Sequence, residues 1–410
     1  MSDSPTDTTG RQSVLIPTGI EMKSYGCIRS LNRHGIHTIV ASDREWIPHF
    51  CSRYCSEQVR LPSHEHHLVA YKDGLLDVAA RPDVKTIIPV RECDTYIFAK
   101  YADEFAEHVS LVSPPLETLR NAHDRLRLAQ AAASAGVPHA ETRRLSDVEE
   151  WTDDVVVKAR YNVLTSDYVD SMGPHEVEEV NDVRFCRAGT EPDADALVES
   201  MHHEPIVQAY IPEADKHLYC ALWDRGEPLV TYQHRQIRKV SWVGGGGVYR
   251  ESVRSQAVEE AAYDLLSHLD WHGFACIEYV KDERTGEWKF LEINPRVWHS
   301  LPEAVRAGVD FPYHYWLATQ GEADRIETGY DTGITCHTSY GELKHLLSLL
   351  YDESPFLEPP SFTKQLAEVA ISCVTHPRFD YIRADDPRFL LSAARALSGI
   401  SVGDEYESDG

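Results

Sequence analysis

Residues 274–296, FACIEYVKDERTGEWKFLEINPR, form the stretch that decides the fold of the second half of this chain. Alternating side chains flank the turn-forming residues 282–286, which predicts an antiparallel hairpin. If the turn centres on Thr285, Glu278 lies directly opposite Glu292. Because successive side chains of a strand point to opposite faces, one apolar face would hold Ile277, Tyr279, Leu291 and Ile293, and the other Cys276, Glu278, Glu292 and Asn294.

The facing glutamates suggest a metal site. Like charges in this position destabilise a hairpin, and a divalent cation between them would remove the repulsion. Mg²⁺ prefers oxygen ligands and usually keeps water or substrate phosphate in its other positions. Asn294 adds a neutral oxygen. The hairpin therefore predicts an Mg²⁺ or Mn²⁺ site at Glu278, Glu292 and Asn294, with a solvated acidic face as the structural alternative.

The first part of the chain alternates short apolar strands with helices. Strands are expected at residues 13–17, 38–42, 58–61, 86–89 and 110–113. This alternation predicts a parallel, doubly wound α/β sheet, whose ligands lie beyond the carboxyl ends of the strands. NAD binding is disfavoured because the first turn, residues 18–22, has one glycine instead of the three of the dinucleotide motif.

The pattern changes near residue 121, where clustered strands and separate helices predict an α+β domain. One apolar strand ends in Lys158, a point cation that suits a nucleotide phosphate, although a strand-end lysine can also simply reach water. After residue 330 the chain is expected to be mostly helical, with a disordered acidic end at 403–410. We therefore predict three parts, at 1–120, 121–330 and 331–410.

Composition narrows the function classes. The 410 residues include 40 basic and 66 acidic side chains, for a net charge of −26. Such a surface argues against nucleic-acid and anionic-membrane partners and suggests a high-salt, halophilic environment. No apolar run approaches the ~18 residues of a membrane span, and the polar N-terminus has no signal core. The nine cysteines show no zinc-site spacing. A cytoplasmic location is the expectation.

Several segments, in order, resemble the ATP-grasp superfamily, especially its ATP-dependent carboligases of the carboxylate–amine ligase type. The resemblance covers about residues 10–325, with a small α/β pre-grasp domain before the grasp itself. The matching segments are the helix from 124 ending in AGVP at 135–138, VVVK at 155–158, QAYIP at 208–212, HRQIR at 234–238 before the glycine loop 244–247, and the hairpin with its NPR at 294–296.

The resemblance implies a role for each matching position. Lys158 would contact the ATP phosphates, and so would Arg125, which stands where many members carry lysine. Adenine would be held by the hinge residues Gln208, Ala209, Tyr210 and Ile211, and ribose by Asp215. One or two Mg²⁺ ions would be held by Glu278, Glu292 and Asn294. The transferring phosphoryl group and the acyl-phosphate would be stabilised by Arg235 and Arg296.

The implied reaction activates a small-molecule carboxylate by attack on the γ-phosphate of ATP, and an amine then displaces phosphate, so that ADP and phosphate are released. Both steps need alignment and charge neutralisation more than a protein nucleophile. A non-catalytic ATP-binding sensor and a biotin-carboxylase-like enzyme are the alternatives.

Two questions stay open at this point. Residues 159–172 lack the glycines of the usual phosphate lid, so either that lid differs or the 244–247 loop does part of the closing. The acid, the amine and the oligomeric state are not identified, although homodimers are common among related folds.

Overall fold

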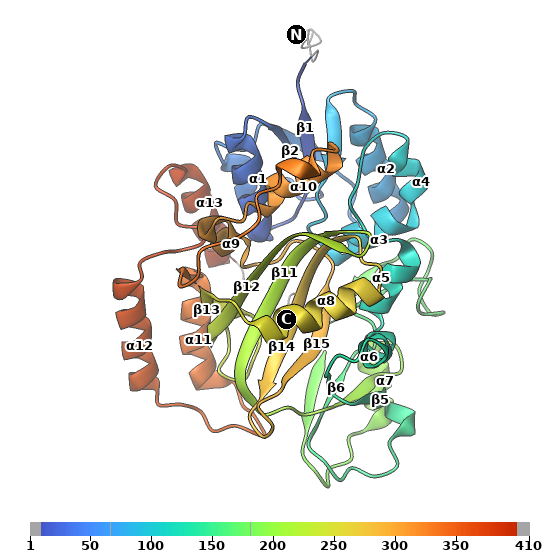
Figure 1. Cartoon of the computed structure of the whole chain (residues 1–410), viewed down its shortest axis with the longest axis vertical. Coiled ribbons are helices and arrows are strands. Elements are labelled where there is room, and N and C mark those ends of the chain that lie inside the picture. Colours follow the sequence, from blue (N-terminus) through green and yellow to red (C-terminus); the bar gives the residue numbers. More distant parts are fainter. Residues whose placement is uncertain (1–9, 66, 181, 400–410) are drawn as a thin grey trace.

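The computed structural model of the chain describes residues 10–65, 67–180 and 182–399. The acidic end at 403–410 lies outside these residues. Three larger groups of strands follow one another along the chain, besides a two-stranded sheet at residues 163–164 and 178–179, and helices cover the faces of the larger groups (Figure 1). None of the described helices combines the length and the hydropathy needed to cross a bilayer.

The first group is a four-stranded sheet of order β3-β2-β1-β4, and its strands are parallel, as the sequence predicts. Leu15, Ile39 and Ala41 pack on one of its faces against α2 and α3. Val14, Ile16 and Val40 pack on the other against α1. The elements are β1 (Ser13–Pro17), α1 (Lys23–Arg33), β2 (His37–Ser42), η1 (Pro48–Cys51), β3 (Glu57–Arg60), α2 (Leu68–Ala79), β4 (Val84–Ile87), α3 (Glu92–Lys100), α4 (Ala102–Ala106) and α5 (Leu116–His123).

The fifth strand predicted at 110–113 is wrong. Ser110 N donates to Lys85 O at 3.1 Å, but Val112 N donates to the Tyr315 hydroxyl at 3.2 Å instead of to a neighbouring strand. Pro114 and Pro115 follow, and proline has no N–H to continue a ladder. A side-chain contact from another part of the molecule therefore takes the place of sheet pairing.

The second group is a small antiparallel sheet of order β5-β10-β6-β9, covered by α7. Its core contains Val155 and Val157 of β6 with Leu197 and Met201 of α7. The elements of this part are α6 (Arg125–Ser134), β5 (Thr142–Arg144), η2 (Leu145–Asp147), β6 (Val155–Lys158), β7 (Val163–Leu164), β8 (Glu178–Glu179), β9 (Val183–Cys186), α7 (Ala194–Met201) and β10 (Ile206–Ala209).

The third group is a six-stranded antiparallel sheet of order β15-β14-β11-β12-β13-β16. Helix α8 crosses one face of it (Figure 1), and α6 packs on the same face. The other face shares its core with α1, α9 and α10. The elements are β11 (Glu213–Asp224), β12 (Glu227–Lys239), β13 (Gly247–Ser252), α8 (Gln256–His268), β14 (Gly273–Asp282), β15 (Trp288–Asn294), α9 (Leu301–Ala307), α10 (Phe311–Thr319), η3 (Ala323–Arg325) and β16 (Thr335–His337).

The hairpin β14–β15 has the predicted register at its open end. Glu278 pairs with Glu292, and Cys276 pairs with Asn294. A bulge after Glu278 then shifts the register, so that Tyr279 pairs with Phe290. Leu291 was expected on the apolar face; instead Phe290 is buried there beside Tyr279, because the extra residue of a bulge loses its partner on the opposite strand.

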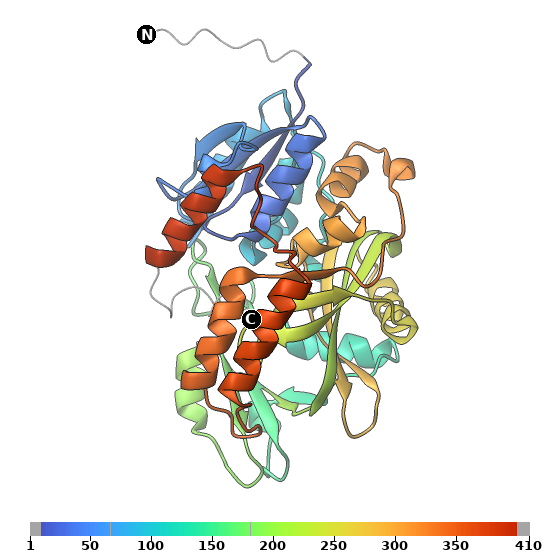
Figure 2. The same ribbon diagram turned by 90° about the vertical axis from the view of Figure 1, so that its left-hand side faces the viewer.

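The chain after residue 330 packs against two parts of the molecule, the large sheet and the N-terminal part. Strand β16 joins the edge of the large sheet, and α11 (Ser339–Tyr351) packs against β12, β13 and α12 (Phe362–Thr375). Helix α13 (Pro387–Gly399) then lies on η1, beside the N-terminal sheet (Figure 2). The helical C-terminal part is thus confirmed, whereas the boundaries at 120 and 330 stay predictions.

Candidate active site

Lys158 and Gln208 lie on the small sheet, close to a group of charged residues on the large sheet, and we call the region between them the cleft. Gln208 pairs with Val156, two residues before Lys158, so the lysine and the glutamine share one face of the small sheet. Lys158 Nζ lies 3.0 Å from Gln208 Oε1. Val155 and Val157 point the other way into the core. The apolar strand thus anchors the lysine and directs its charge away from the core.

The opposite wall carries the two facing glutamates, and each has a cationic partner. Lys216 Nζ lies 2.5 Å from Glu278 Oε2, and Arg125 Nη2 lies 3.4 Å from Glu292 Oε2. Asn294 Nδ2 lies 3.4 Å from Glu292 Oε1. The repulsion that suggested a metal is therefore already offset by Lys216 and Arg125. The donor set still suits Mg²⁺, because two carboxylates and a carboxamide offer only hard oxygen ligands on this wall.

Lys216 is a site residue that the sequence analysis missed. It lies on β11, where Leu218 is the residue paired with Glu278. Lys216 shares the face of Leu218, since the two residues are two positions apart. The available signal was its place eight residues after Gln208, but only the pairing of β11 with β14 brings it to the glutamate.

The cleft shifts the pKa values of its own charged groups. Removal from solvent, helped by the nearby Arg125 and Lys216, lowers the pKa of Lys158 to about 8. Burial would also lower the pKa of Lys216, but Glu278 raises it above the ordinary value. Burial would raise the pKa of Glu292, yet Arg125 and the two lysines hold it below the usual range. Three cations thus face two carboxylates, and an anionic phosphate chain would relieve the excess.

The hinge residues 208–211 lie at the end of β10 and directly after it, and two of them donate backbone hydrogen bonds to neighbouring segments. Ala209 N donates to Glu141 O at 2.9 Å, and Tyr210 N donates to Asp154 O at 3.0 Å. The Tyr210 ring stacks on Phe356, with the ring centroids 4.2 Å apart. Ile211 follows directly and is half-buried. An adenine contact by residues 208–211 therefore stays a prediction, and two of their N–H groups are already used.

Asp215, the predicted ribose ligand, lies on β11 beside His217. Its Oδ2 atom is 3.3 Å from His217 Nε2. Burial would raise the pKa of Asp215, but the hydrogen bond with His217 keeps it below the ordinary value. The carboxylate is therefore ionised at neutral pH, but it shares the sheet face of His217, the residue paired with Arg235, whereas Lys216 and Glu278 lie on the opposite face, so a ribose contact stays a prediction.

The two predicted catalytic arginines have different surroundings. Arg296 is buried, and its Nε lies 2.9 Å from Oε1 of Glu92, at the start of α3. Arg235 is half-exposed on the other face of its sheet, with Nη2 2.7 Å from Glu251 Oε2. Its neighbours His234 and Gln236 face the cavity described next. The structure thus brings Arg296 to the site and does not bring Arg235.

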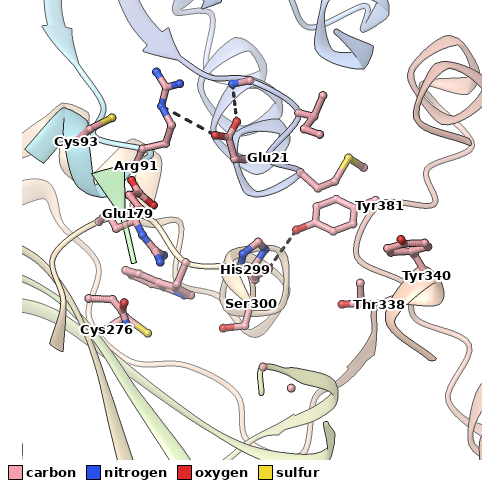
Figure 3. A pocket seen from close by; sticks show the side chains of 18 of the residues that line it. Glu21, Arg91, Cys93, Glu179, Cys276, His299, Ser300, Thr338, Tyr340 and Tyr381 are labelled. Carbon is pink, nitrogen blue, oxygen red and sulfur yellow. Dashed lines mark hydrogen bonds and ion pairs between the residues drawn. The ribbon is translucent and has the colours of Figure 1, made fainter. Parts of the chain in front are cut away.

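A cavity of about 940 Å³ extends from the glutamate wall toward the N-terminal sheet and the C-terminal helices. Glu278, Asn294 and Arg296 line it. Figure 3 shows further lining side chains, among them Glu21, Arg91, Glu179, Tyr340 and Tyr381. The sequence analysis selected none of these five. They come from separate segments, and no local pattern links them.

Both candidate covering segments contribute to this cavity. Residues 176–179 line it from the 159–180 segment, and residues 246–247 line it from the glycine loop. The first segment is held against the N-terminal part, where Lys100 Nζ lies 2.7 Å from Asp167 Oδ2 and Leu68 N donates to His175 O at 3.0 Å. Side-chain and backbone contacts therefore hold this segment in place although it has few glycines, and its role as a lid stays a prediction.

The first turn of the N-terminal sheet also lines the cavity, and a carboxylate occupies it. Glu21 Oε2 accepts a hydrogen bond of 2.5 Å from Gly19 N, and Glu21 Oε1 lies 4.0 Å from Arg91 Nε. A pyrophosphate would need that backbone donor. That donor is already used by Glu21, and the expectation that this sheet does not bind NAD stays a prediction.

Searches with the sequence found neither a matching family model nor a matching curated protein. Solved structures do match. N5-carboxyaminoimidazole synthetase of Staphylococcus aureus with ADP has a TM-score of 0.57 at 14% identity, over 79% of this chain and 80% of that one. The L-amino acid ligase of Bacillus licheniformis has a TM-score of 0.54 at 14% identity, over 78% and 77%.

A further match bears on the ligands. The biotin carboxylase domain of Hydrogenobacter thermophilus 2-oxoglutarate carboxylase, in complex with MgADP, ADP and bicarbonate, has a TM-score of 0.57 at 17% identity, over 77% of this chain and 71% of that one. The chain also resembles pyruvate carboxylase of Rhizobium etli, of which it covers only 27%. At these identities the likeness concerns the fold, and the fold of this chain is the ATP-grasp fold.

Proposed function

We propose that this protein is an ATP-dependent ligase that activates a carboxylate as an acyl-phosphate and joins it to an amine. The observation that carries the proposal is the proximity of Lys158 to Glu278 and Glu292, beside a large cavity that Glu278, Asn294 and Arg296 line. Charges suited to a phosphate chain thus lie next to space for a second substrate.

In this mechanism ATP lies between the two sheets. Lys158 and Arg125 neutralise its phosphate oxygens and align the chain for transfer. Mg²⁺, which would be held by Glu278, Glu292 and Asn294, supplies further neutralisation of the phosphates when it is bound. The substrate carboxylate attacks the γ-phosphorus, the bond to the β-phosphate oxygen breaks, and ADP leaves.

Arg296 acts at the next stage. Its guanidinium, oriented by Glu92, would stabilise the negative charge of the acyl-phosphate and of the tetrahedral species formed from it. The amine nitrogen attacks the acyl carbon, loses a proton, and phosphate departs. Because Arg235 lies on the other sheet face, we give it no part in this step.

A biotin-carboxylase-like reaction is the second candidate, since one similar structure contains bicarbonate. Bicarbonate would occupy only a small part of a cavity of about 940 Å³. The size of the cavity therefore favours a larger acid. Bicarbonate is included among the acids in the experiment below.

Product analysis tests the proposal. The protein is incubated with MgATP, hydroxylamine and single carboxylic acids or bicarbonate, in molar salt because a chain of −26 repels itself when unscreened. We expect ADP, phosphate and a hydroxamate, all dependent on the acid. AMP and pyrophosphate formed in step with hydroxamate would contradict phosphoryl transfer, and ATP binding without turnover with any acid would indicate a sensor.

Two further features belong to the proposal. A cytoplasmic, high-salt setting would supply ATP and screen the acidic surface, and activity should then increase with salt.

The second feature is the homodimer. Light scattering at the same salt concentrations tests whether it forms.

A further inference from the structure

The cavity has two chemically different ends. Charged side chains, Glu21, Arg91 and Glu179, lie on one side of His299 and Ser300 (Figure 3). Tyr340 and Tyr381 lie on the other side. The Tyr381 hydroxyl donates to His299 O at 3.2 Å, so this ring is fixed at the wall.

The second end is built largely from residues that follow the ATP-grasp part. The residues that line the cavity from this segment are Thr338, Ser339, Tyr340, Tyr381, Ile382, Leu390, Ala393 and Ala394, and only the first two carry aliphatic hydroxyl groups. Ile20 and Met22, which pack against the adjoining apolar core, line the cavity from the N-terminal part. Carbon atoms thus dominate this wall, which suits an apolar ligand group.

Helix α13 holds its part of the wall by specific contacts. The Phe389 ring stacks on Tyr25 with centroids 3.7 Å apart, and Asp386 Oδ2 accepts a hydrogen bond of 2.5 Å from Ser52 Oγ. Leu390 faces the cavity, whereas Leu391, the next residue, is 72% exposed. The apolar wall is therefore present before any ligand binds.

We infer that the acid activated by this protein carries an apolar substituent, and that the wall formed by Tyr340, Tyr381, Ile382, Leu390 and Ala394 receives it. The carboxylate of this acid then lies at the Arg296 end, where phosphate transfer occurs. This inference rests on the proposed function and adds the chemical class of the acid. Burial of each added methylene from water supplies the selectivity.

The test uses the full chain in molar salt, with MgATP, hydroxylamine and a series of acids. Acetate, butyrate, hexanoate and phenylacetate form the apolar set, and glycolate and succinate form the polar set. We expect kcat/KM for hydroxamate formation to increase about fourfold per methylene, and on the order of a hundredfold from acetate to hexanoate.

Matched substitutions on α13 locate the effect. Leu390→Glu should reduce the increase to less than about twofold per methylene, because a carboxylate replaces the apolar contact. Leu391→Glu adds the same charge at the next residue, which does not line the cavity. This variant should keep the wild-type increase in kcat/KM per methylene. Ala394→Trp places a large ring at the lining of the cavity and should lower kcat/KM for hexanoate relative to acetate by roughly tenfold. Thermal melting shows whether each variant is folded. If Leu390→Glu is unfolded, the result with Ala394→Trp tests the inference instead.

The outcomes separate the two levels of the proposal. Hydroxamate formed equally from all acids, or fastest from glycolate or succinate, overturns the apolar-acid inference and leaves the ligase function in place. An equal effect of Leu390→Glu and Leu391→Glu also overturns it. If no acid gives ADP while the folded protein binds MgATP, the proposed function fails, and the inference that rests on it fails as well.

Discussion

Two groups of charged side chains in this protein, a buried cluster around Arg250 and the cluster in the cleft, differ in whether each of their cations already has an anionic partner. In the buried cluster, Arg250 Nε lies 2.9 Å from Glu303 Oε2 and Arg250 Nη2 lies 2.5 Å from Asp380 Oδ2, while Nη1 donates to Gly247 O at 2.7 Å. In the cleft cluster, Lys158 contacts the neutral Gln208. The cleft cluster consists of Arg125, Lys158, Lys216, Glu278 and Glu292.

The difference teaches what distinguishes a structural ion pair from a ligand site. Each nitrogen of Arg250 has a fixed acceptor, so this guanidinium holds β13, α9 and the C-terminal segment together. Burial raises the pKa of Glu303 to about 7, although Arg250 opposes the shift. In the cleft it is a cation, Lys158, whose pKa is lowered. An unsatisfied positive charge there gains by binding an anion, whereas the buried cluster has little to gain.

The largest expected effect is that of Glu292→Gln in the cleft. We expect kcat to fall by at least about a thousandfold, because the change removes a metal ligand and leaves the nearby cations without their carboxylate. The protein should remain folded and melt at a slightly lower temperature, since Arg125 loses its partner. Single-turnover ADP formation and thermal melting with and without EDTA measure both effects. Wild-type activity in Glu292→Gln, or turnover in EDTA, would contradict the metal assignment.

In the buried cluster we expect a loss of stability. Arg250→Met should lower the free energy of unfolding by about 3–5 kcal/mol, because Asp380 would be left as a buried charge and Glu303 would lose its partner and favour its protonated form. Arg235→Met is the matched control, since it removes a half-exposed pair with Glu251 and should cost about 0–1 kcal/mol. Chemical denaturation in constant salt measures both values. Equal losses would mean that the two ion pairs contribute alike.

The two arginines of the sequence prediction provide a third test. Arg296→Ala should lower kcat about 10²–10³-fold, as loss of one oxyanion donor does, whereas Arg235→Ala should change it less than about twofold. Arg296→Lys should restore part of the rate, because a cation remains near the acyl-phosphate. A strong defect in Arg235→Ala, with normal melting, would place the reaction on the other face of the sheet.

The smallest expected effect concerns pH. Lys158 binds phosphate as a cation, and its pKa is about 8 in the free protein. As the pH increases through 8 the lysine loses its proton, so kcat/KM for ATP should fall by up to about tenfold per pH unit. In Lys158→Arg the side chain stays charged, and the fall should disappear. An identical alkaline limb in both proteins would assign that titration to another group.

Local sequence was sufficient for the hairpin and for four of the five strands predicted in the N-terminal sheet. The facing of Glu278 and Glu292 follows from strand alternation and from the length of the turn between them, which are properties of about twenty consecutive residues. The place of Lys158 at the end of an apolar strand is local in the same sense. The bulge that replaces Leu291 with Phe290 was not predicted, because one inserted residue leaves no mark in an alternating pattern.

Alternation predicts which side chains share a face, but it does not tell which face meets the cavity. On β12 this choice separates Arg235, on the exposed face, from His234 and Gln236, on the cavity face. Only packing of the sheet against α1, α9 and α10 makes that choice. The same packing places Glu92 beside Arg296.

The sequence by itself thus determined which residues pair, and which side chains share a face, within a single segment. The tertiary structure alone decided the partners of Lys216 and Arg296 and the apolar end of the cavity. That end depends on contacts such as Asp386 with Ser52, which are 334 residues apart. The physical reason is that local hydrogen bonding and side-chain period act over a few residues, whereas the approach of distant segments depends on the burial of all their apolar surfaces together.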